Sequence, residues 1–465
     1  MKQVRASISV FLALTVSLVL SFCMILIESA RENAMLLKAD LIFQIGTQCI
    51  MAEYHQDLWE KYELFYIDCS YGMEVPDYEN VEFHLKQYIE ENLKYDGYGW
   101  LSLVYEGVQI SDVRLASDNV GKDLYTKAIE KAKESIGITY AEQAIRWLRQ
   151  VESTSYIQDY LDRENQEAYQ VIGDVNGSSV EVEEEIWGVD KKGQPILLEE
   201  AKYETVDIYN PLDKILSGNI LLKQVIEDES NISLNKINTM QLPSKRQLAE
   251  GRAPIREEET SMLDKALFCK YVLDHMNSFF DCENTNEEGL QYPVEYLIGG
   301  RAADNLNMEV VVVKLLALRE VDNYLQLLQD EGRRAEAEAI GAAAAALVPW
   351  VGPVVAQATL IYWAYEESIE DIQRLLRGET VPLVKSLGLD ELSLNILDYE
   401  EYLYILLLMQ SKETLITRTM DMIEMDIRRK QGGFRIDACL SYFEMQGAFT
   451  DIYNKKYYVS QKLQY

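Results

Sequence analysis

Residues 8–27 read ISVFLALTVSLVLSFCMILI, twenty positions from Ile8 to Ile27 without a charge, a glycine or a proline. A helix of this length rises about 30 Å, which matches the hydrocarbon thickness of a lipid bilayer. Lys2 and Arg5 precede the run, and Glu28 follows it directly. The sequence therefore predicts one transmembrane helix, with membrane lipid as the partner of residues 8–27.

A cleaved secretory signal and a buried core helix are the alternatives to a retained anchor. A signal sequence has an apolar run of about 7 to 15 residues and ends at small residues. Here the run is longer and continues into the charged segment ESARE. A lipoprotein signal needs a small residue before its cysteine, whereas Phe22 precedes Cys23. We therefore favour a retained anchor.

The charges that flank the run predict its orientation. Lys2 and Arg5 lie before it and Glu28 lies after it. Since positive residues stay on the cytoplasmic side of a membrane, the N-terminus is predicted to be inside. We expect a single-pass protein of the cytoplasmic membrane, with the bulk of the chain extracellular.

The rest of the chain is strongly acidic. The 77 acidic and 44 basic residues give a formal net charge of −33, and every acidic residue follows the anchor. Such a surface repels nucleic acid, so no nucleic-acid partner is predicted. Acidity of this kind also keeps an exposed domain soluble, and the composition alone does not separate that explanation from a role in binding cations.

The cysteines predict free thiols. One of the six lies in the anchor, which leaves an odd number outside it, and no C-x-x-C pair occurs; they are Cys23, Cys49, Cys69, Cys269, Cys282 and Cys439. This pattern argues against a disulfide framework and against a zinc site. A bridge between Cys269 and Cys282 is the one open alternative to buried thiols.

The hydrophobic pattern after the anchor predicts a helix-rich α+β fold. Apolar residues recur at helical spacing beyond the membrane, so the transmembrane helix is expected to continue as an amphipathic helix to about residue 66. Residues 100–116 and 170–208 show the alternation and turn signals of strands. Helices are expected through most of 262–377 and 399–430, before two final strands.

These elements suggest two domains outside the membrane. We predict a leader and anchor at 1–27, a membrane-proximal mixed α/β domain at 28–227, a polar linker at 228–260 that contains two prolines, and a mainly helical domain at 261–465. The last domain is expected to be closed by a C-terminal β-hairpin of residues 434–449 and 456–465.

A second uncharged stretch, residues 339–365, is a candidate for another membrane span. Two prolines and a glycine, Pro349, Gly352 and Pro353, interrupt its centre, and much of it is alanine, which is less favourable in lipid than leucine or isoleucine. Each half is about ten residues, too short to span alone. We therefore favour a buried helical hairpin over a second crossing.

No recognised reaction centre occurs in the sequence. The three histidines, His55, His84 and His275, lack the neighbours of a metal or nucleophile site, and there is no H-E-x-x-H, G-x-S-x-G or P-loop. We predict no catalytic residue, no cofactor, no metal and no small-molecule substrate, and therefore not an enzyme. Asp174 and Asn176, with the glutamates of 181–185, do not fit a calcium loop, and an exposed acidic hairpin is favoured there.

The layout of the N-terminus resembles the TadE and TadG type pseudopilins of tight-adherence (Flp) pilus systems. The resemblance is carried by RASISVF entering the span and by ESAR leaving it, residues 5–11 and 28–31. Beyond residue 120 the chain resembles an uncharacterised bacterial family associated with those pilus loci. The similar segments are NPL (210–212), LPS (242–244), EYLIGG (295–300), the alanine-rich hairpin, VPLVK (381–385) and DYEEYL (398–403).

The resemblance implies a pilus connection and supplies no activity. The glycine and glutamate that mark prepilin peptidase substrates are missing near the span, so we expect an uncleaved protein. The resulting hypothesis is a non-catalytic, membrane-anchored component or assembly factor of a Tad/Flp-type pilus or related apparatus, with pilus or envelope proteins as partners. The alternative is a surface enzyme that acts on cell-wall polymer through a carboxylate pair.

Overall fold

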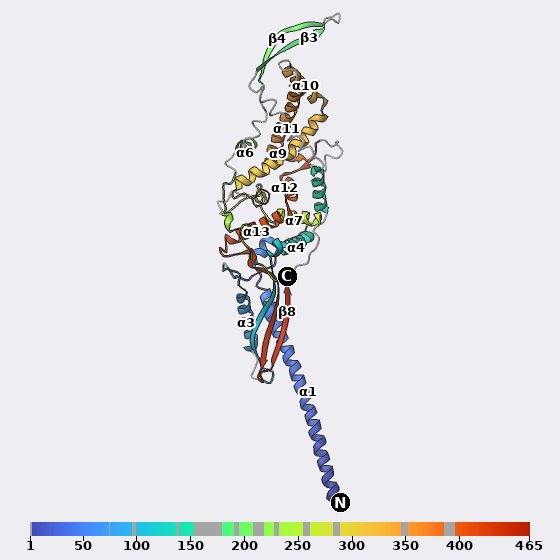
Figure 1. The fold of residues 1–465 in the computed structure, drawn as a ribbon, viewed down its shortest axis with the longest axis vertical. Helices are drawn as coiled ribbons and strands as arrows, with labels where there is room; N and C mark the ends of the chain where they lie inside the picture. The colour runs from blue at the N-terminus through green and yellow to red at the C-terminus, as the bar shows by residue number, and fades with distance from the viewer. Residues whose placement is uncertain are drawn as a thin grey trace. The chain divides into compact units, whose positions relative to one another are not determined.

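The computed structural model describes residues 2–73, 75–94, 99–135, 139–152, 179–189, 195–207, 218–226, 232–253, 261–281, 289–345, 352–385 and 396–465. The fold is helix-rich with a smaller share of sheet, as predicted. The chain forms two compact units (Figure 1). Unit 1 consists of Met1–Lys131, Met240–Glu259 and Thr419–Tyr465, and unit 2 consists of Ala132–Thr239 and Thr260–Arg418.

Unit 1 begins with a long helix, α1 (Lys2–Met51). Among the described helices, only this one is long and apolar enough to cross a membrane. Nearly every side chain of residues 8–27 is exposed, so this part of α1 has no cover from the rest of unit 1. The predicted anchor helix and its continuation beyond the apolar run are therefore present as a single rod of about 75 Å.

The rod is shorter than the sequence pattern suggested. It ends at Met51 rather than near residue 66, and a new helix, α2 (Gln56–Tyr62), starts after a short break. The His55 side chain caps α2 by accepting a hydrogen bond from the Leu58 backbone N–H, and Glu63 ends it in the left-handed conformation. The apolar spacing alone favours one continuous helix, but the cap at His55 starts a separate short helix instead.

An antiparallel sheet covers one side of the second half of α1. Its central strand, β7 (Cys439–Asp451), pairs with β2 (Leu103–Leu115) along one edge. Along the other edge it pairs with β8 (Lys456–Gln464) and with the short β1 (Ile67–Asp68). Another helix, α3 (Tyr78–Lys94), packs against α1 and β2.

The pairing of β7 with β2 corrects the expected place of the C-terminal hairpin. The β7–β8 hairpin forms as predicted, but it lies in unit 1 and does not close the helical part of the chain. The two units therefore do not follow the boundaries expected from the sequence. The physical reason is that buried residues alternate along β7, so this strand needs both a strand to pair with and a helix to cover its apolar face. The pairing strand is β2, and the covering helix is α1.

The core of unit 1 fixes α1 to the sheet. Among its members from α1, α3 and β7 are Met35, Ala39, Ile42, Phe43, Ile50, Val81, Leu85, Ile89, Phe443, Met445 and Phe449. Gly447 is needed for this contact, since a Cβ there would lie 2.5 Å from the Phe43 ring. Phe43 and Phe449 meet edge to face, with ring centroids 6.5 Å apart.

The described part of the predicted linker is folded. Residues 240–253 belong to unit 1, after the short 3-10 helix η3 (Thr239–Gln241). Arg246 forms ion pairs with the buried Glu424 and Asp437, both at 2.6 Å. The Gly251 N–H donates to Asp118 at the start of α4 (Asp118–Ser135) at 2.7 Å. A polar composition indicated a linker here, but these polar groups are paired in the interior of unit 1.

Unit 2 is mainly helical. Residues 139–152 are helical, and the other helices that lie wholly within it are α6 (Gly218–Val225), α7 (Met262–His275), α8 (Pro293–Gly299), α9 (Asp304–Gln329), α10 (Glu331–Ala345), α11 (Gly352–Leu376) and α12 (Tyr399–Met409). Two hairpins accompany them, β3 (Ser179–Val189) with β4 (Pro195–Asp207) and β5 (Val381–Pro382) with β6 (Ile396–Leu397). The chain passes from unit 2 to unit 1 within α13 (Lys412–Arg428).

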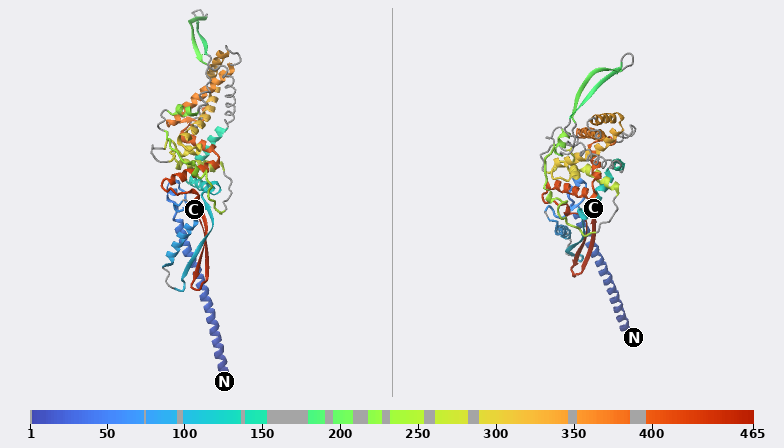
Figure 2. Two further views of the ribbon diagram at one scale, coloured as in Figure 1. Left: turned by 60° about the vertical axis from the view of Figure 1, so that its left-hand side comes forward. Right: turned by 45° about the horizontal axis from the view of Figure 1, so that its top comes forward.

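The alanine-rich stretch forms the closely packed helices α10 and α11, which Figure 2 shows side by side. Gly341 of α10 lies so close to the Gly352 carbonyl that a Cβ would approach it to 2.3 Å. Most residues of α11 on the side of this contact are buried, whereas most residues of α10 are exposed. The helical pairing agrees with the hairpin expected for residues 339–365. Burial of its first half is wrong, because residues 339, 340 and 342 of α10 are exposed and Gly341 is buried at the contact with α11.

Candidate functional site

Between residues 33 and 48, the positions of α1 that the sheet leaves exposed carry no charge. Between residues 33 and 48 the exposed positions, named here the outer face of α1, are Asn33, Leu36, Leu37, Leu41, Gln44, Ile45 and Gln48. Leu37, Leu41 and Ile45 are 61%, 49% and 44% exposed and are spaced four residues apart, which places them in one row. In a chain with a net charge of −33, such a face is suited to contact with another apolar surface.

The charged residues of the same helix segment are engaged within unit 1. Lys38 Nζ donates to the Leu101 carbonyl at 2.8 Å, and Asp40 accepts from Gln461 of β8 at 3.4 Å. Arg31 is buried between α1 and the end of β7. Folding thus turns the charges of α1 toward the sheet and leaves the outer face neutral.

Arg31 links α1 to the β7–β8 turn. Its guanidinium pairs with Glu28 at 2.7 Å and with Asp451 at 3.1 Å, and it lies 4.7 Å from the centre of the Tyr453 ring. The hydrogen bond from Arg31 lowers the pKa of Glu28. Burial alone would raise the pKa of Asp451, but backbone N–H donors from Lys455 and Tyr453, together with Arg31, lower it overall.

Unit 2 contains a separate pocket of about 390 Å³ between α9, the end of α12 with the two residues after it, and residues 383–384. Its lining is mostly aliphatic, and the polar side chains among its lining residues are Lys314, Asp322, Gln410 and Ser411. Burial lowers the pKa of Lys314, and the nearby Arg418 lowers it further. Volume and lining suit a small apolar group.

A buried ion cluster lies beside this pocket. The guanidinium of Arg319 is fully buried and donates to Asp371 at 3.0 Å, to Asp322 at 2.9 Å and to the Leu383 carbonyl at 2.9 Å. Lys385 Nζ also pairs with Asp371, at 2.7 Å. The oxygens of Asp322 additionally accept from the Lys385 backbone N–H. The carboxylate of Asp322, which lines the pocket, is therefore paired with Arg319 and with the backbone of the fold.

A second buried carboxylate, Glu295 of α8, has one oxygen without a partner. Its Oε1 accepts from the Phe279 N–H at 2.9 Å and from the Tyr399 hydroxyl at 3.0 Å, while Oε2 has no partner among the residues that the structure describes. Burial raises the pKa of Glu295 to about 7. No sequence motif indicated this residue, because its environment is made by aromatic residues that are distant in the chain.

The residues that the sequence analysis singled out for the anchor all belong to α1. Ile8 and Ile27 are exposed on α1, at 60% and 47%, and Glu28 pairs with Arg31. Lys2 and Arg5 lie in the first turns of the helix, and their side chains lie outside the described residues. The sequence pattern had already placed Leu37, Leu41 and Ile45 on one apolar stripe of the helix beyond the membrane, but only the tertiary structure shows that the sheet leaves this side uncovered.

The histidines and cysteines take structural positions. His55 contacts Gln431 at 2.8 Å, His84 contacts Glu53 at 3.0 Å and His275 contacts the Tyr271 carbonyl at 2.8 Å. In the part of the chain that the structure describes, no three His, Cys, Asp or Glu residues are grouped for a metal. The cysteines in that part are free, and the possible partner of Cys269, Cys282, lies outside it. Asp174 and Asn176 also lie outside it, while 181–185 form part of β3.

The fold and site define a helix-rich α+β protein with one helix of membrane-spanning length. Residues 199–451, more than half of the chain, match a family of unknown function, DUF5702, and the chain belongs to this family. No curated protein and no solved structure matches the chain.

Proposed function

We propose that the protein is a non-catalytic component or assembly factor of a Tad/Flp-type pilus or a related surface apparatus. Residues 8–27 anchor it in the cytoplasmic membrane as a single pass, with the N-terminus inside and both units outside. The outer face of α1 then packs laterally against a helix of another membrane-anchored envelope protein. The observation that carries this proposal is that the neutral outer face continues the apolar surface of the anchor.

Lipid does not explain the outer face. Along the helix, Leu37 lies about 15 Å and Ile45 about 27 Å beyond Ile27, whereas the headgroup layer is roughly 5 to 8 Å thick on each side. If residues 8–27 occupy the hydrocarbon core, the row of Leu37, Leu41 and Ile45 stands above the membrane. With lipid excluded, the apolar surface of another protein is what can cover these three side chains.

The row has the spacing of a helix-packing seam. Residues four apart form the ridges that enter the grooves of a neighbouring helix. Each of the three side chains is about half exposed, so covering all three contributes roughly 3 kcal/mol. A free energy of this size is too small to hold together two proteins that are free in solution. It suffices for association when both partners are anchored in one membrane, because confinement raises their effective concentration.

The resemblance of the N-terminal layout to TadE and TadG type pseudopilins supports the pilus connection. Membership of a family of unknown function supplies no activity that would compete with it. The proposed orientation rests on Lys2 and Arg5 before the span and Glu28 after it.

Surface labelling of intact cells tests the topology. Met240 is 78% exposed, so a Met240→Cys variant presents a thiol in the chain after the anchor. The described native cysteines beyond the anchor are buried or half-buried, and the unaltered protein measures the labelling of all native thiols. A membrane-impermeant maleimide should label the variant without lysis. Labelling that requires lysis would place this part inside the cell and remove the proposed function.

Site-specific photocrosslinking tests the lateral contact. A photoreactive phenylalanine at Leu41 should form adducts in living cells with a second membrane-anchored envelope protein or a second copy of the chain, identified by mass spectrometry. The same probe at Leu234, which is 70% exposed in unit 2, is the matched control. Adducts of equal yield at both positions, or none at Leu41, would contradict the proposal.

A paired variant separates contact from folding. Leu37→Gln combined with Ile45→Gln should abolish the adducts at Leu41 and leave the melting temperature within about 2 °C of the parent, because both side chains already face solvent. Loss of adducts together with a large drop in melting temperature would point to a structural role instead.

A further inference from the structure

We infer that one end of unit 1 rests in the lipid headgroup layer of the membrane that holds α1, so that the folded body is seated on the bilayer rather than held above it on a free rod. This end consists of the β7–β8 turn, with Ile452 and Tyr453, and of Trp100 and Leu101 just before β2. We name these four residues the basal rim. The inference rests on the proposed anchoring of residues 8–27.

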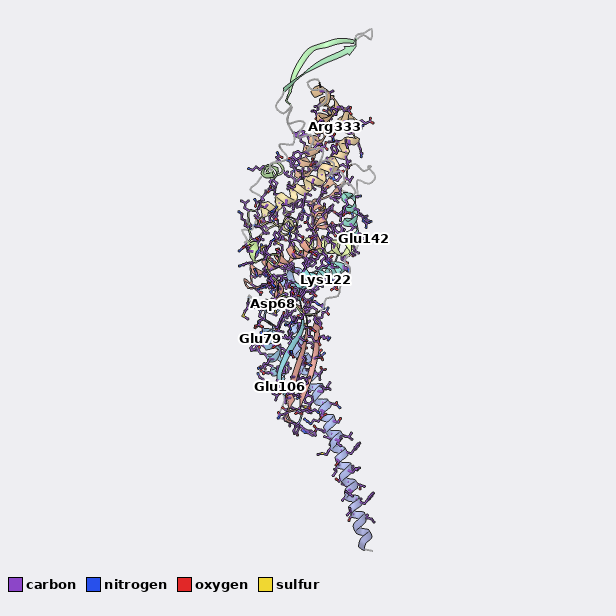
Figure 3. The ribbon with its side chains drawn as sticks, in the orientation of Figure 1. Asp68, Glu79, Glu106, Lys122, Glu142 and Arg333 are labelled. Atoms are coloured by element: carbon purple, nitrogen blue, oxygen red, sulfur yellow. The ribbon has the colours of Figure 1, made fainter. Side chains whose placement is uncertain are left out.

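The basal rim is apolar and uncovered. Ile452 and Tyr453 are 56% and 61% exposed, and Trp100 and Leu101 are 55% and 41% exposed. The two segments lie at the same end of the sheet, because Leu103 at the start of β2 pairs with Asp451 at the end of β7. Figure 3 shows Glu106 of β2 near this end, beside the point where the uncovered part of α1 leaves the sheet.

The contacts of Arg31 give the height of this end along α1. Arg31 is four residues beyond Ile27, which is about 6 Å. Helix side chains lean toward the N-terminus, and the Arg31 guanidinium accordingly pairs with Glu28, one turn nearer the anchor. The same guanidinium holds Asp451 and lies over the Tyr453 ring. The turn is therefore level with Glu28 to Arg31, at the depth of the headgroup layer.

The turn is held rigidly at that depth. Asp451 Oδ1 accepts from the backbone N–H groups of Tyr453 and Lys455, both at 2.9 Å, and Asn454 adopts a left-handed conformation. Lys455 pairs with Glu32 of α1. These contacts attach the turn to the helix, so an anchored helix cannot hold the turn far from the membrane.

The chemistry of the basal rim matches a headgroup layer. Tyrosine and tryptophan concentrate at this depth, where the ring is buried among lipid and its polar atom stays hydrated. Most of the nearby acidity is offset, since Arg31 pairs with both Glu28 and Asp451, Lys455 pairs with Glu32, and Lys456 pairs with Glu106 at 3.0 Å, which leaves one more carboxylate than cations. The net acidity of the chain therefore does not oppose this local contact.

Lipid photocrosslinking of the full chain in phosphatidylcholine vesicles tests the inference. A photoreactive phenylalanine is placed at Tyr453, at Tyr458 or at Leu18, and lipid adducts are quantified by mass spectrometry. Tyr458 is a matched control, because it is 58% exposed on the same hairpin but pairs with Ala448, about 10 Å farther from the turn. Leu18 is 72% exposed in the middle of the apolar run.

Lipid adducts at Tyr453 and Leu18, at least tenfold above those at Tyr458, would support the inference. Adducts at Leu18 without adducts at Tyr453 would overturn it and leave the anchor intact. Protein adducts at Tyr453 in cells, with no lipid adducts, would also overturn it by assigning the basal rim to another occupant. Absence of lipid adducts at Leu18 would overturn the anchoring itself, and the inference with it.

Discussion

Replacing Glu295 with glutamine should remove a pH-dependent loss of stability from unit 2. The carboxyl group is fully buried, and burial raises its pKa to about 7 from 4.5. A carboxylate with a raised pKa binds its proton more tightly in the folded state, so its contribution is fully present below pH 4.5 and is lost as the pH rises through 7. The pKa difference corresponds to about 3 kcal/mol in the free energy of unfolding.

The glutamine side chain keeps the contact with the Phe279 N–H and the Tyr399 hydroxyl through its carbonyl oxygen. Its amide N–H groups enter the place of the unpartnered Oε2, which costs about 1 to 3 kcal/mol at every pH. The decisive quantity is therefore the change with pH. Relative to the parent, Glu295→Gln should gain about 3 kcal/mol between pH 4 and pH 8.

Hydrogen exchange of amides in α8 and α12, followed as a function of urea, reports the stability of unit 2 without assuming that both units unfold together. The difference between variant and parent is compared at pH 4 and at pH 8. A difference that stays constant within about 0.5 kcal/mol, an order-of-magnitude tolerance for such comparisons, would refute the buried raised-pKa carboxylate. Glu142→Gln, on an exposed part of the helix 139–152, is the control and should show no such change.

Four further substitutions, one of them a control, test the packing within the two units. Asp437→Asn should lower the free energy of unfolding of unit 1 by about 2 kcal/mol at pH 6, because ion pairs lower the pKa of Asp437 to about 2 from 3.8. Near pH 2 the parent carboxylate becomes protonated, so the difference between variant and parent should disappear. Chemical unfolding at both pH values measures this difference. Gly447→Val should push the Phe43 ring away and lower the stability of unit 1 by about 1 to 3 kcal/mol, measured by exchange of the β7 amides. Gly341→Val should separate α10 from α11 at a similar cost in unit 2, whereas Gly332→Ala, at an exposed end of α10, should be neutral or stabilising in thermal melts.

Patterns within the chain predicted the local elements well where periodicity was sustained. The strand at 103–115 and the C-terminal hairpin follow from alternation, and the helices of unit 2 follow from apolar spacing. The break after Met51 was missed because the apolar spacing continues past it, while the cap at His55 acts locally. Residues 240–253 were wrongly assigned to a linker. A polar composition looks the same in the sequence whether the side chains face water or pair with one another inside a folded unit.

The candidate site was only partly predictable for a related reason. Ile8, Ile27 and Glu28 could be chosen from the sequence alone, since they mark the ends of a run that is defined by residues adjacent in the chain. The outer face of α1 could not, because Leu37 and Met35 look alike in the sequence. Met35 is fully buried and Leu37 is 61% exposed, and the sheet decides which of them remains for a partner.

The amino-acid sequence by itself determined the apolar run of residues 8–27, the length of this run and the acidity of the chain beyond it. These properties depend on composition and on residues that are adjacent in the chain. Only the tertiary structure decided that a strand near residue 445 pairs with one near residue 110, that Arg31 holds Asp451, and that Glu295 is buried with the Tyr399 hydroxyl as a donor. The reason is that burial and charge pairing are set by neighbours in space, which here come from segments separated by hundreds of residues.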